Sequence, residues 1–385
     1  MREEMKELNP RLSEIFLQCS RDFLSDFDEN GYAWGHEVEY SRNGKPMSYM
    51  VYICFVVILG YKFWGQEEKV AWTIPFTYKG EAFIATHRKL GFRICAAKET
   101  SKAGPLVLEM LLKLKNMIRL ADGIVEPIIK EQVAFCNCTI LNKYSDFMSR
   151  YEFFREKADS TFKTPPPPRR LDEPLGEVPS IWSFKNNILR EGFYYTQAML
   201  DAYFSYLEHV LVLLVSFEPD FDRERDSLDS IIFSDWTSKY NRIIKPESNP
   251  KGMRYYNKLK EIKEKFRNTF AHGGFEKNGS PYFVHFPGLG AIPLSLSKFT
   301  NSVHFHITPI REIEFSEICT FLDEFEDYLE GLLFRPMQII KAGIDISYNE
   351  PNRKEYQLAL RSDEDVEEFI EHETYLWERQ ANMEW

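Results

Sequence analysis

A proline-rich segment, TPPPPRRLDEPLGEVPS at residues 164–180, constrains the fold of this chain more than any other feature of its sequence. Four consecutive prolines favour an extended, semi-rigid conformation and cannot continue a helix. The spacing of apolar residues also changes across this segment, from mixed strand and helix patterns before it to helical patterns after it. The sequence therefore predicts two domains, at 1–163 and 181–340, with a linker at 164–180 and an acidic tail at 341–385.

The first domain is expected to be α+β, a small antiparallel sheet with helices. Asn43-Gly44 lies between two strand-like runs within residues 37–59, which predicts a hairpin. Lys79-Gly80 marks the turn of a second expected hairpin, over residues 69–86. Helices are expected at 3–28, 103–121 and 124–158. No catalytic motif stands out here, so the expected role is that of a sensor or regulator.

The second domain is expected to be a mainly α-helical antiparallel bundle with a small β insertion. Apolar residues at helical spacing predict four helical segments, at 193–217, 227–243, 253–271 and 311–334. The insertion between the third and fourth contains two strand-like runs, SPYFVHFPG at 280–288 and NSVHFHITP at 301–309.

Charge and cysteine content limit the classes of function. The net charge of −11 excludes a general polyanion binder, so any contact with nucleic acid needs a local basic patch. The first residues, MREEMKELNPRLSEIF, do not resemble a secretory signal, and the apolar run at 49–61 is too short to span a bilayer. The six cysteines lack zinc-site spacing, which indicates free thiols. A cytoplasmic protein without membrane contact is expected.

The stretch FRNTFAHGGF at 266–275 is the candidate site. Asn268 and His272 are four residues apart and share one face of a helix. Arg267 and His272 are five apart, about 140° around an ideal helix, so they diverge unless the helix end unwinds. Helix capping alone also explains the stretch, because Gly273 and Gly274 suit a helix terminus and a histidine suits its last turn.

Arg267-Asn268-Thr269-Phe270-Ala271-His272 resembles the Arg-x4-His motif of the HEPN superfamily, and of its ribonuclease members in particular. The resemblance covers about 181–340, and the β insertion departs from the minimal four-helix form. The resemblance implies that the motif lies near the end of a long helix in a bundle. It also implies an earlier long helix that often carries an acidic residue. Glu208 is the candidate for that supporting residue.

The resemblance also implies what the site does. It implies catalytic roles for Arg267, Asn268 and His272, no cofactor or metal, and a homodimer whose two motifs form one composite site. RNA carries its own nucleophile, the 2′-hydroxyl, so cleavage needs a base near neutral pKa and a cation for the phosphate, which His and Arg provide. The hypothesis is a metal-independent RNA endonuclease, an anti-phage defence or toxin effector. A phage or regulatory trigger would act on the first domain.

Two other function classes stay open: a non-catalytic HEPN module that binds nucleotide, RNA or a partner protein, and a helical adaptor. Several residues have competing interpretations. The histidines His285, His304 and His306 are either structural or metal ligands. The lysines at 258, 260, 263 and 265 form either a basic approach to the site or a solvated face interleaved with Glu261 and Glu264. Residues 361–385, with nine acidic and two basic side chains, are either a solvated tail or a segment that docks over the site.

Overall fold

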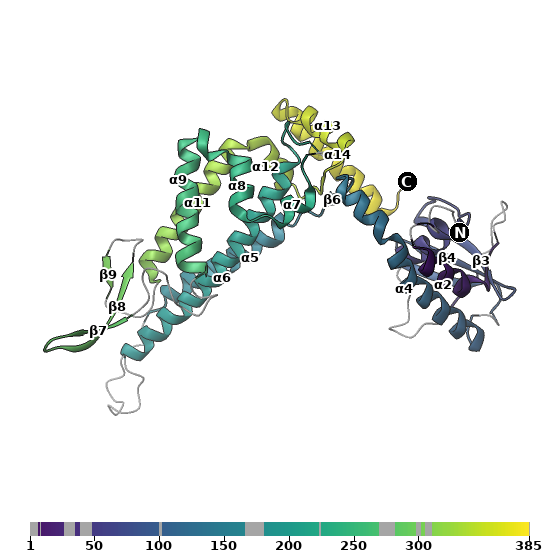
Figure 1. Cartoon of the computed structure of the whole chain (residues 1–385), viewed down its shortest axis with the longest axis horizontal. Helices are drawn as coiled ribbons and strands as arrows, with labels where there is room; N and C mark the ends of the chain where they lie inside the picture. The colour runs from purple at the N-terminus through teal and green to yellow at the C-terminus, as the bar shows by residue number, and fades with distance from the viewer. Residues whose placement is uncertain are drawn as a thin grey trace. The chain divides into compact units, whose positions relative to one another are not determined.

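The computed structural model of this 385-residue chain describes residues 7, 9–26, 35–38, 48–99, 102–165, 181–222, 225–268, 282–297, 302–304 and 310–384. Within these ranges, only the backbone is described at 181–186, 265, 267–268, 282–283, 293–297 and 302–304. The chain forms two compact units (Figure 1). Unit 1 comprises 1–135 and 371–385, and unit 2 comprises 136–370. The fold is mixed α+β with a helical majority.

Unit 1 is built on a five-stranded antiparallel sheet in the order β1-β3-β4-β5-β2. Its strands are β1 (Phe23–Ser25), β2 (His36–Glu37), β3 (Val70–Tyr78), β4 (Glu81–Arg88) and β5 (Gly91–Ala96). Its helices are α2 (Pro10–Ser20), α3 (Ser48–Tyr52), the π-helix η1 (Ile53–Ile58) and α4 (Pro105–Ala134). Buried side chains of α4, η1 and the sheet form one apolar core.

The second predicted hairpin is confirmed. Strands β3 and β4 pair from Val70↔Arg88 to Tyr78↔Glu81, with Lys79-Gly80 as the two-residue turn. Both turn residues have positive φ, 48° at Lys79 and 84° at Gly80, which is the conformation of the type I′ turns that match the twist of a hairpin.

The first predicted hairpin is wrong in its second strand. Residues 48–58, expected as a strand, form α3 and η1, and Val51, Phe55 and Ile58 of this segment are fully buried. A short apolar run that is buried on several sides looks the same in sequence whether it is helix or strand. The helix expected at 3–28 is also shorter, because α2 ends at Ser20 and β1 follows.

Unit 2 is a helical assembly around α6 (Ile181–Val215). Its other helices are α5 (Tyr144–Phe162), α7 (Leu228–Phe233), α8 (Trp236–Ile244), the 3₁₀ helix η3 (Pro246–Ser248), α9 (Pro250–Ile262), the π-helix η4 (Lys263–Asn268), α11 (Glu312–Leu332), α12 (Phe334–Lys341) and α13 (Glu350–Ala359), and α14 (Asp363–Asn382) begins in it. Its strands are β6 (Thr139–Ile140), paired with β10 (Ile346–Ser347), and a meander of β7 (Tyr282–Phe286), β8 (Gly290–Ser297) and β9 (Ser302–His304).

Helix α6 is long and apolar enough to cross a membrane by length and composition. However, 72% of its apolar window is buried inside the protein, as in the core helix of a helical bundle. The strand-like runs expected in the insertion correspond to β7 and β9, and β8 lies between them.

The boundary between the units differs from the one predicted at the proline-rich segment. Helix α5 precedes that segment but packs along α6, with the rings of Tyr151 and Tyr203 5.2 Å apart. The two helices approach so closely that a Cβ on Gly192 would lie 2.5 Å from the Phe162 ring. The prolines interrupt the helical pattern, but the chain returns to the same core, and the units divide at Phe135 and Cys136.

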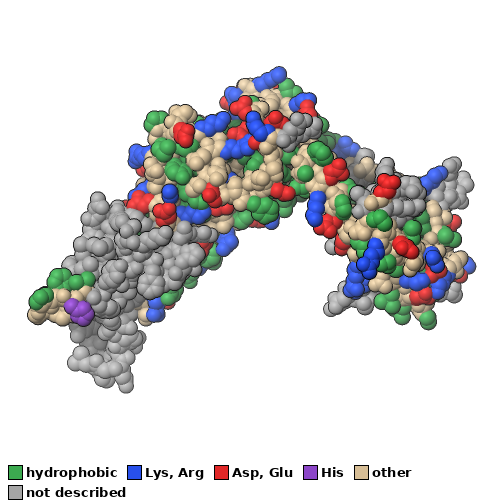
Figure 2. Space-filling model, viewed as in Figure 1, with side chains coloured by type: hydrophobic (Ala, Val, Ile, Leu, Met, Phe, Trp, Pro, Cys, Tyr) green, Lys and Arg blue, Asp and Glu red, His purple; other side chains and the backbone are tan. Residues whose placement is uncertain are grey.

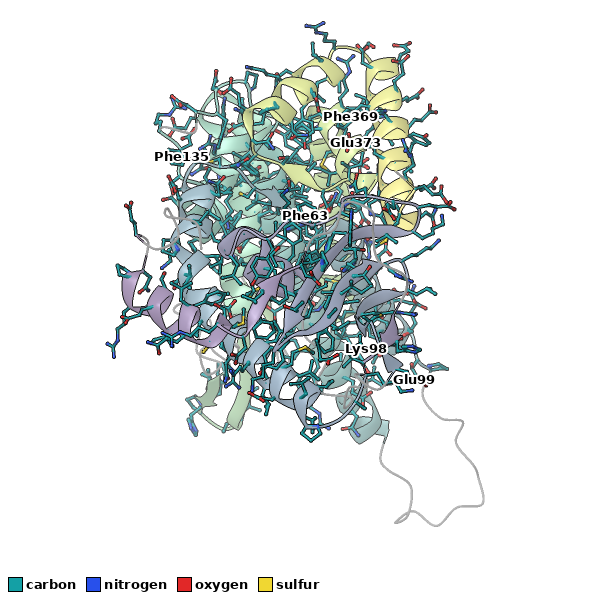
Figure 3. All side chains as sticks on the ribbon, turned by 90° about the vertical axis from the view of Figure 1, so that its right-hand side faces the viewer. Phe63, Lys98, Glu99, Phe135, Phe369 and Glu373 are labelled. Carbon is teal, nitrogen blue, oxygen red and sulfur yellow. The ribbon has the colours of Figure 1, made fainter. Side chains whose placement is uncertain are left out.

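The segment 341–385 is folded and is not a tail. Tyr348 and Tyr356 are buried in unit 2, where the Arg353 guanidinium donates hydrogen bonds to the backbone carbonyls of Ser216, Glu218 and Phe221. Phe369 and Glu373 lie on successive turns of α14, on either side of the division between units (Figure 3).

The last residues of the chain belong to unit 1. Lys69 forms a 2.9 Å ion pair with Glu384, and Lys89 donates a 2.8 Å hydrogen bond to Asn382. Residues 382–384 therefore have partners in a unit that does not contain the Arg-x4-His motif. This arrangement gives the docking interpretation of the acidic segment no support.

Candidate functional site

The candidate motif begins at the end of a continuous helix. Asn249 starts α9 by accepting a 3.0 Å hydrogen bond from the Gly252 N–H, with a proline in the first turn. The helix then widens into η4, whose last two residues are Arg267 and Asn268. Their backbone is described and their side chains are not, while His272 lies outside the described residues. The catalytic assignments therefore stay predictions. π-helical segments occur frequently at functional sites.

A buried ion cluster anchors the first residue of η4. The Lys263 ammonium lies 3.1 Å from one carboxylate oxygen of Glu208 on α6, and Lys239 of α8 lies 3.8 Å from the other. The Lys263 side chain is only 11% exposed, and its ammonium lies 5.1 Å from the Phe204 ring centre and 5.3 Å from that of Trp236. A carboxylate and two aromatic faces thus replace the water that this ammonium loses.

This cluster corrects one expectation about the lysines. Lys258 and Lys260 do pair with glutamates of their own helix, at 3.1 Å from Glu261 and 3.9 Å from Glu264, as on a solvated face. Lys263 instead points into the bundle. The Lys265 side chain lies outside the described atoms.

Glu208 was predicted to support Arg267. Among the described side chains its partners are Lys263 and Lys239, and Lys263 lies four residues before Arg267 on the same helix. The Arg267 side chain lies outside the described atoms, so direct support stays a prediction. A second contact acts on the same turn, because the Gln197 side-chain amide on α6 donates to the Phe266 carbonyl. This hydrogen bond ties the backbone of η4 to α6 one residue before Arg267.

Two further titratable groups, one on α11 and one on α6, were given no role from the sequence. Glu326 of α11 is partly buried and accepts hydrogen bonds from the Tyr203 and Tyr206 hydroxyls, at 2.6 and 2.7 Å. Burial raises the pKa of Glu326, and the two hydroxyl donors act in the opposite direction.

His209, next to Glu208, accepts a 2.9 Å hydrogen bond at Nε2 from the Lys143 backbone N–H, and its ring lies 5.2 Å from that of Phe147. Burial, with a smaller contribution from the charge of Lys143, lowers the pKa of His209 to about 4. The imidazole is therefore neutral near pH 7, and it lies at the N-terminus of α5, where a positive charge is disfavoured.

Of the three histidines in the insertion, only His285 has a described side chain. His285 is exposed on β7, only the backbone of His304 is described on β9, and His306 lies outside the described residues. Among the residues that were described, no three His, Cys, Asp or Glu side chains gather as metal ligands.

Comparison of the chain with protein-family models, with curated proteins and with solved structures gave no match.

Proposed function

We propose that the chain is a metal-independent RNA endonuclease with Arg267, Asn268 and His272 as its catalytic residues. The proposal is carried by the Arg-x4-His motif of the sequence, and it is supported by the contacts that α6 makes with η4, the helix that contains Arg267 and Asn268. The Glu208–Lys263 ion pair and the Gln197–Phe266 hydrogen bond both act within four residues of Arg267. Such fixed backbone is what a catalytic group needs in order to hold its geometry.

In the proposed reaction, the 2′-oxygen of a ribose attacks the adjacent phosphorus while an imidazole takes the 2′-hydroxyl proton. The bond from phosphorus to the 5′-oxygen breaks, and a second proton donor protonates that oxygen. The products are a 2′,3′-cyclic phosphate and a 5′-hydroxyl. Arg267 stabilises the charge on the phosphorane oxygens, and Asn268 orients the imidazole or donates to the same phosphate.

A homodimer would supply the two proton-transfer groups. One His272 acts as the base and its counterpart in the second copy acts as the acid, which also removes the difficulty that Arg267 and His272 diverge on one helix. We further propose that unit 1 senses a phage or regulatory trigger and that cleavage serves anti-phage defence.

The site variants test the proposal with matched controls. His272→Ala should lower cleavage of labelled RNA by two to four orders of magnitude, because general acid–base help is lost. Arg267→Lys should also impair cleavage, since an ammonium lacks the two-pronged donor geometry of a guanidinium. The exposed residues His372 and Arg254 offer the controls His372→Ala and Arg254→Lys, which should cleave like the parent.

If His272→Ala cleaves RNA as fast as the parent, His272 is not a catalytic residue and the assigned site is wrong. Binding of RNA, nucleotide or a partner protein without cleavage by the parent would instead favour the non-catalytic alternative. A protein that cleaves while sedimenting strictly as a monomer would contradict the composite site.

A further inference from the structure

The hairpin formed by β7 and β8 ends in a turn that its glycines define. The strands pair from Tyr282↔Leu294 to Phe286↔Gly290. Pro287 and Gly288 form the centre of the turn, the Leu289 N–H donates a 3.1 Å hydrogen bond to the Phe286 carbonyl, and φ is 81° at Gly288. Proline followed by a residue of positive φ is the pattern of a type II turn. Gly290, with φ of 83°, then returns the chain into β8.

This turn leaves large apolar side chains in solvent. Phe286 is 41% exposed and Leu289 is 75% exposed. His285 and Ala291 oppose each other across the strands, and both are exposed. Figure 2 shows hydrophobic side chains and a histidine on the described part of this hairpin. The tip therefore offers an aromatic ring, an imidazole and an aliphatic side chain for contact.

The charge of this region is unlike that of the rest of the chain. Residues 277–311 contain no Asp or Glu, whereas 59 acidic residues spread evenly over 385 would place about five in a stretch of 35. The same stretch holds three basic residues and three of the eight histidines. The net charge of −11 repels a polyanion from the chain as a whole. Residues 277–311 contribute no carboxylate to that repulsion.

We infer that the tip of the β7–β8 hairpin binds single-stranded RNA, with Phe286 stacking on a base. The inference rests on the proposed function and adds a substrate-binding element to it. Strand β7 begins fourteen residues after Asn268, and β9 ends eight residues before Glu312, so the meander lies in the chain between η4 and α11 of unit 2 (Figure 1). An exposed aromatic ring stacks on any unpaired base, whereas paired bases do not offer their faces. RNA carries a negative charge on every phosphate, so it gains more from the absence of carboxylates than an uncharged protein surface would.

The test measures binding separately from cleavage. The full chain carrying His272→Ala is titrated with a fluorescent single-stranded RNA, and the dissociation constant is compared with and without a hairpin substitution. Phe286→Ala should weaken binding about 5- to 100-fold, the range expected when one base loses its aromatic partner. Phe286→Trp should retain binding. The control is Phe233→Ala, an 84% exposed phenylalanine of α7 that lies in the chain between Asp229 and Asp235, which should leave binding unchanged.

A second pair of variants tests the charge argument. Ala291→Glu introduces a carboxylate opposite His285 and should weaken RNA binding more at low salt than at high salt, whereas the neutral Ala291→Gln should not. Circular dichroism confirms that each variant is folded.

The outcomes separate this inference from the proposed function. If the parent cleaves RNA but Phe286→Ala binds and cleaves as the parent does, the hairpin inference is wrong and the proposed function stands. If Phe286→Ala weakens binding while the parent never cleaves, the hairpin inference stands and the proposed function is wrong. A His272→Ala protein that binds no single-stranded RNA overturns the hairpin inference whatever the cleavage activity of the parent.

Discussion

His209 should make unit 2 less stable in mild acid. Its Nε2 accepts a hydrogen bond from the Lys143 N–H, so protonation requires that bond to break and places a charge in a half-buried site at a helix N-terminus. The folded pKa of about 4 lies below the ordinary value of 6.5. The unfolded chain therefore binds more protons between these values, and stability present above about pH 6.5 is lost as the pH falls towards 4.

The magnitude follows from the two pKa values. Integrating the difference in bound protons from pH 7 to pH 5 gives a loss of about 2 kcal/mol. Because the side chain is only half-buried and solvent screens part of the effect, we expect a loss of about 1–2 kcal/mol in the free energy of unfolding.

Urea unfolding at about pH 7 and pH 5 measures this loss, with His209→Gln as the comparison. The glutamine amide oxygen can accept the same hydrogen bond from Lys143 but does not titrate, so the variant should lose about 1–2 kcal/mol less than the parent between the two pH values. His285→Gln, at an exposed histidine of the same unit, controls for the loss of an imidazole ring. Equal pH dependence of the parent and His209→Gln would refute the reasoning.

Three further predictions concern other contacts of the described residues. Tyr206→Phe removes one hydroxyl donor from the partly buried Glu326 carboxylate and should cost about 1–3 kcal/mol in unfolding experiments; an unchanged midpoint would contradict the cluster. Gln197→Leu releases the Phe266 carbonyl and should lower the rate of RNA cleavage while costing only about 1 kcal/mol of stability, and an unaltered rate would show that this contact does not position the motif. Truncation after Arg361 removes the fully buried Val366 and should lower the melting temperature without faster cleavage, whereas faster cleavage by a folded truncated protein would restore the docking interpretation.

The sequence correctly predicted a hairpin and several helices that depend on residues close together in the chain. Lys79-Gly80 marked its hairpin because a two-residue turn with positive φ depends on the turn residues themselves. Helices α6, α9 and α11 were recognised because apolar spacing persists over several turns, whereas the shorter α12 and α13 were not predicted. Residues 48–58 were assigned wrongly because burial on several sides removes the periodicity that separates helix from strand.

Long-range packing was not readable from the sequence. Four prolines mark a break in helical pattern, but they do not reveal that the chain after them returns as α6 and packs on α5, where Gly192 leaves space for Phe162. At the candidate site, the motif was proposed from six consecutive residues. The side chains that contact the helix before it, Glu208 and Gln197, come from α6. Lys263 looked like one more lysine of a charged face, and only its contacts with Glu208, Phe204 and Trp236 show that it points inward.

The most direct test of the central proposal is the chemistry of the cut ends. The purified parent protein is incubated in EDTA with an RNA and with the same RNA carrying 2′-deoxyribose at the cleaved positions. The account predicts cleavage of the first alone, with 2′,3′-cyclic phosphate and 5′-hydroxyl ends, and loss of that cleavage in His272→Ala. Cleavage of the 2′-deoxy substrate, or ends of a different kind, would contradict attack by the 2′-hydroxyl and with it the proposed function.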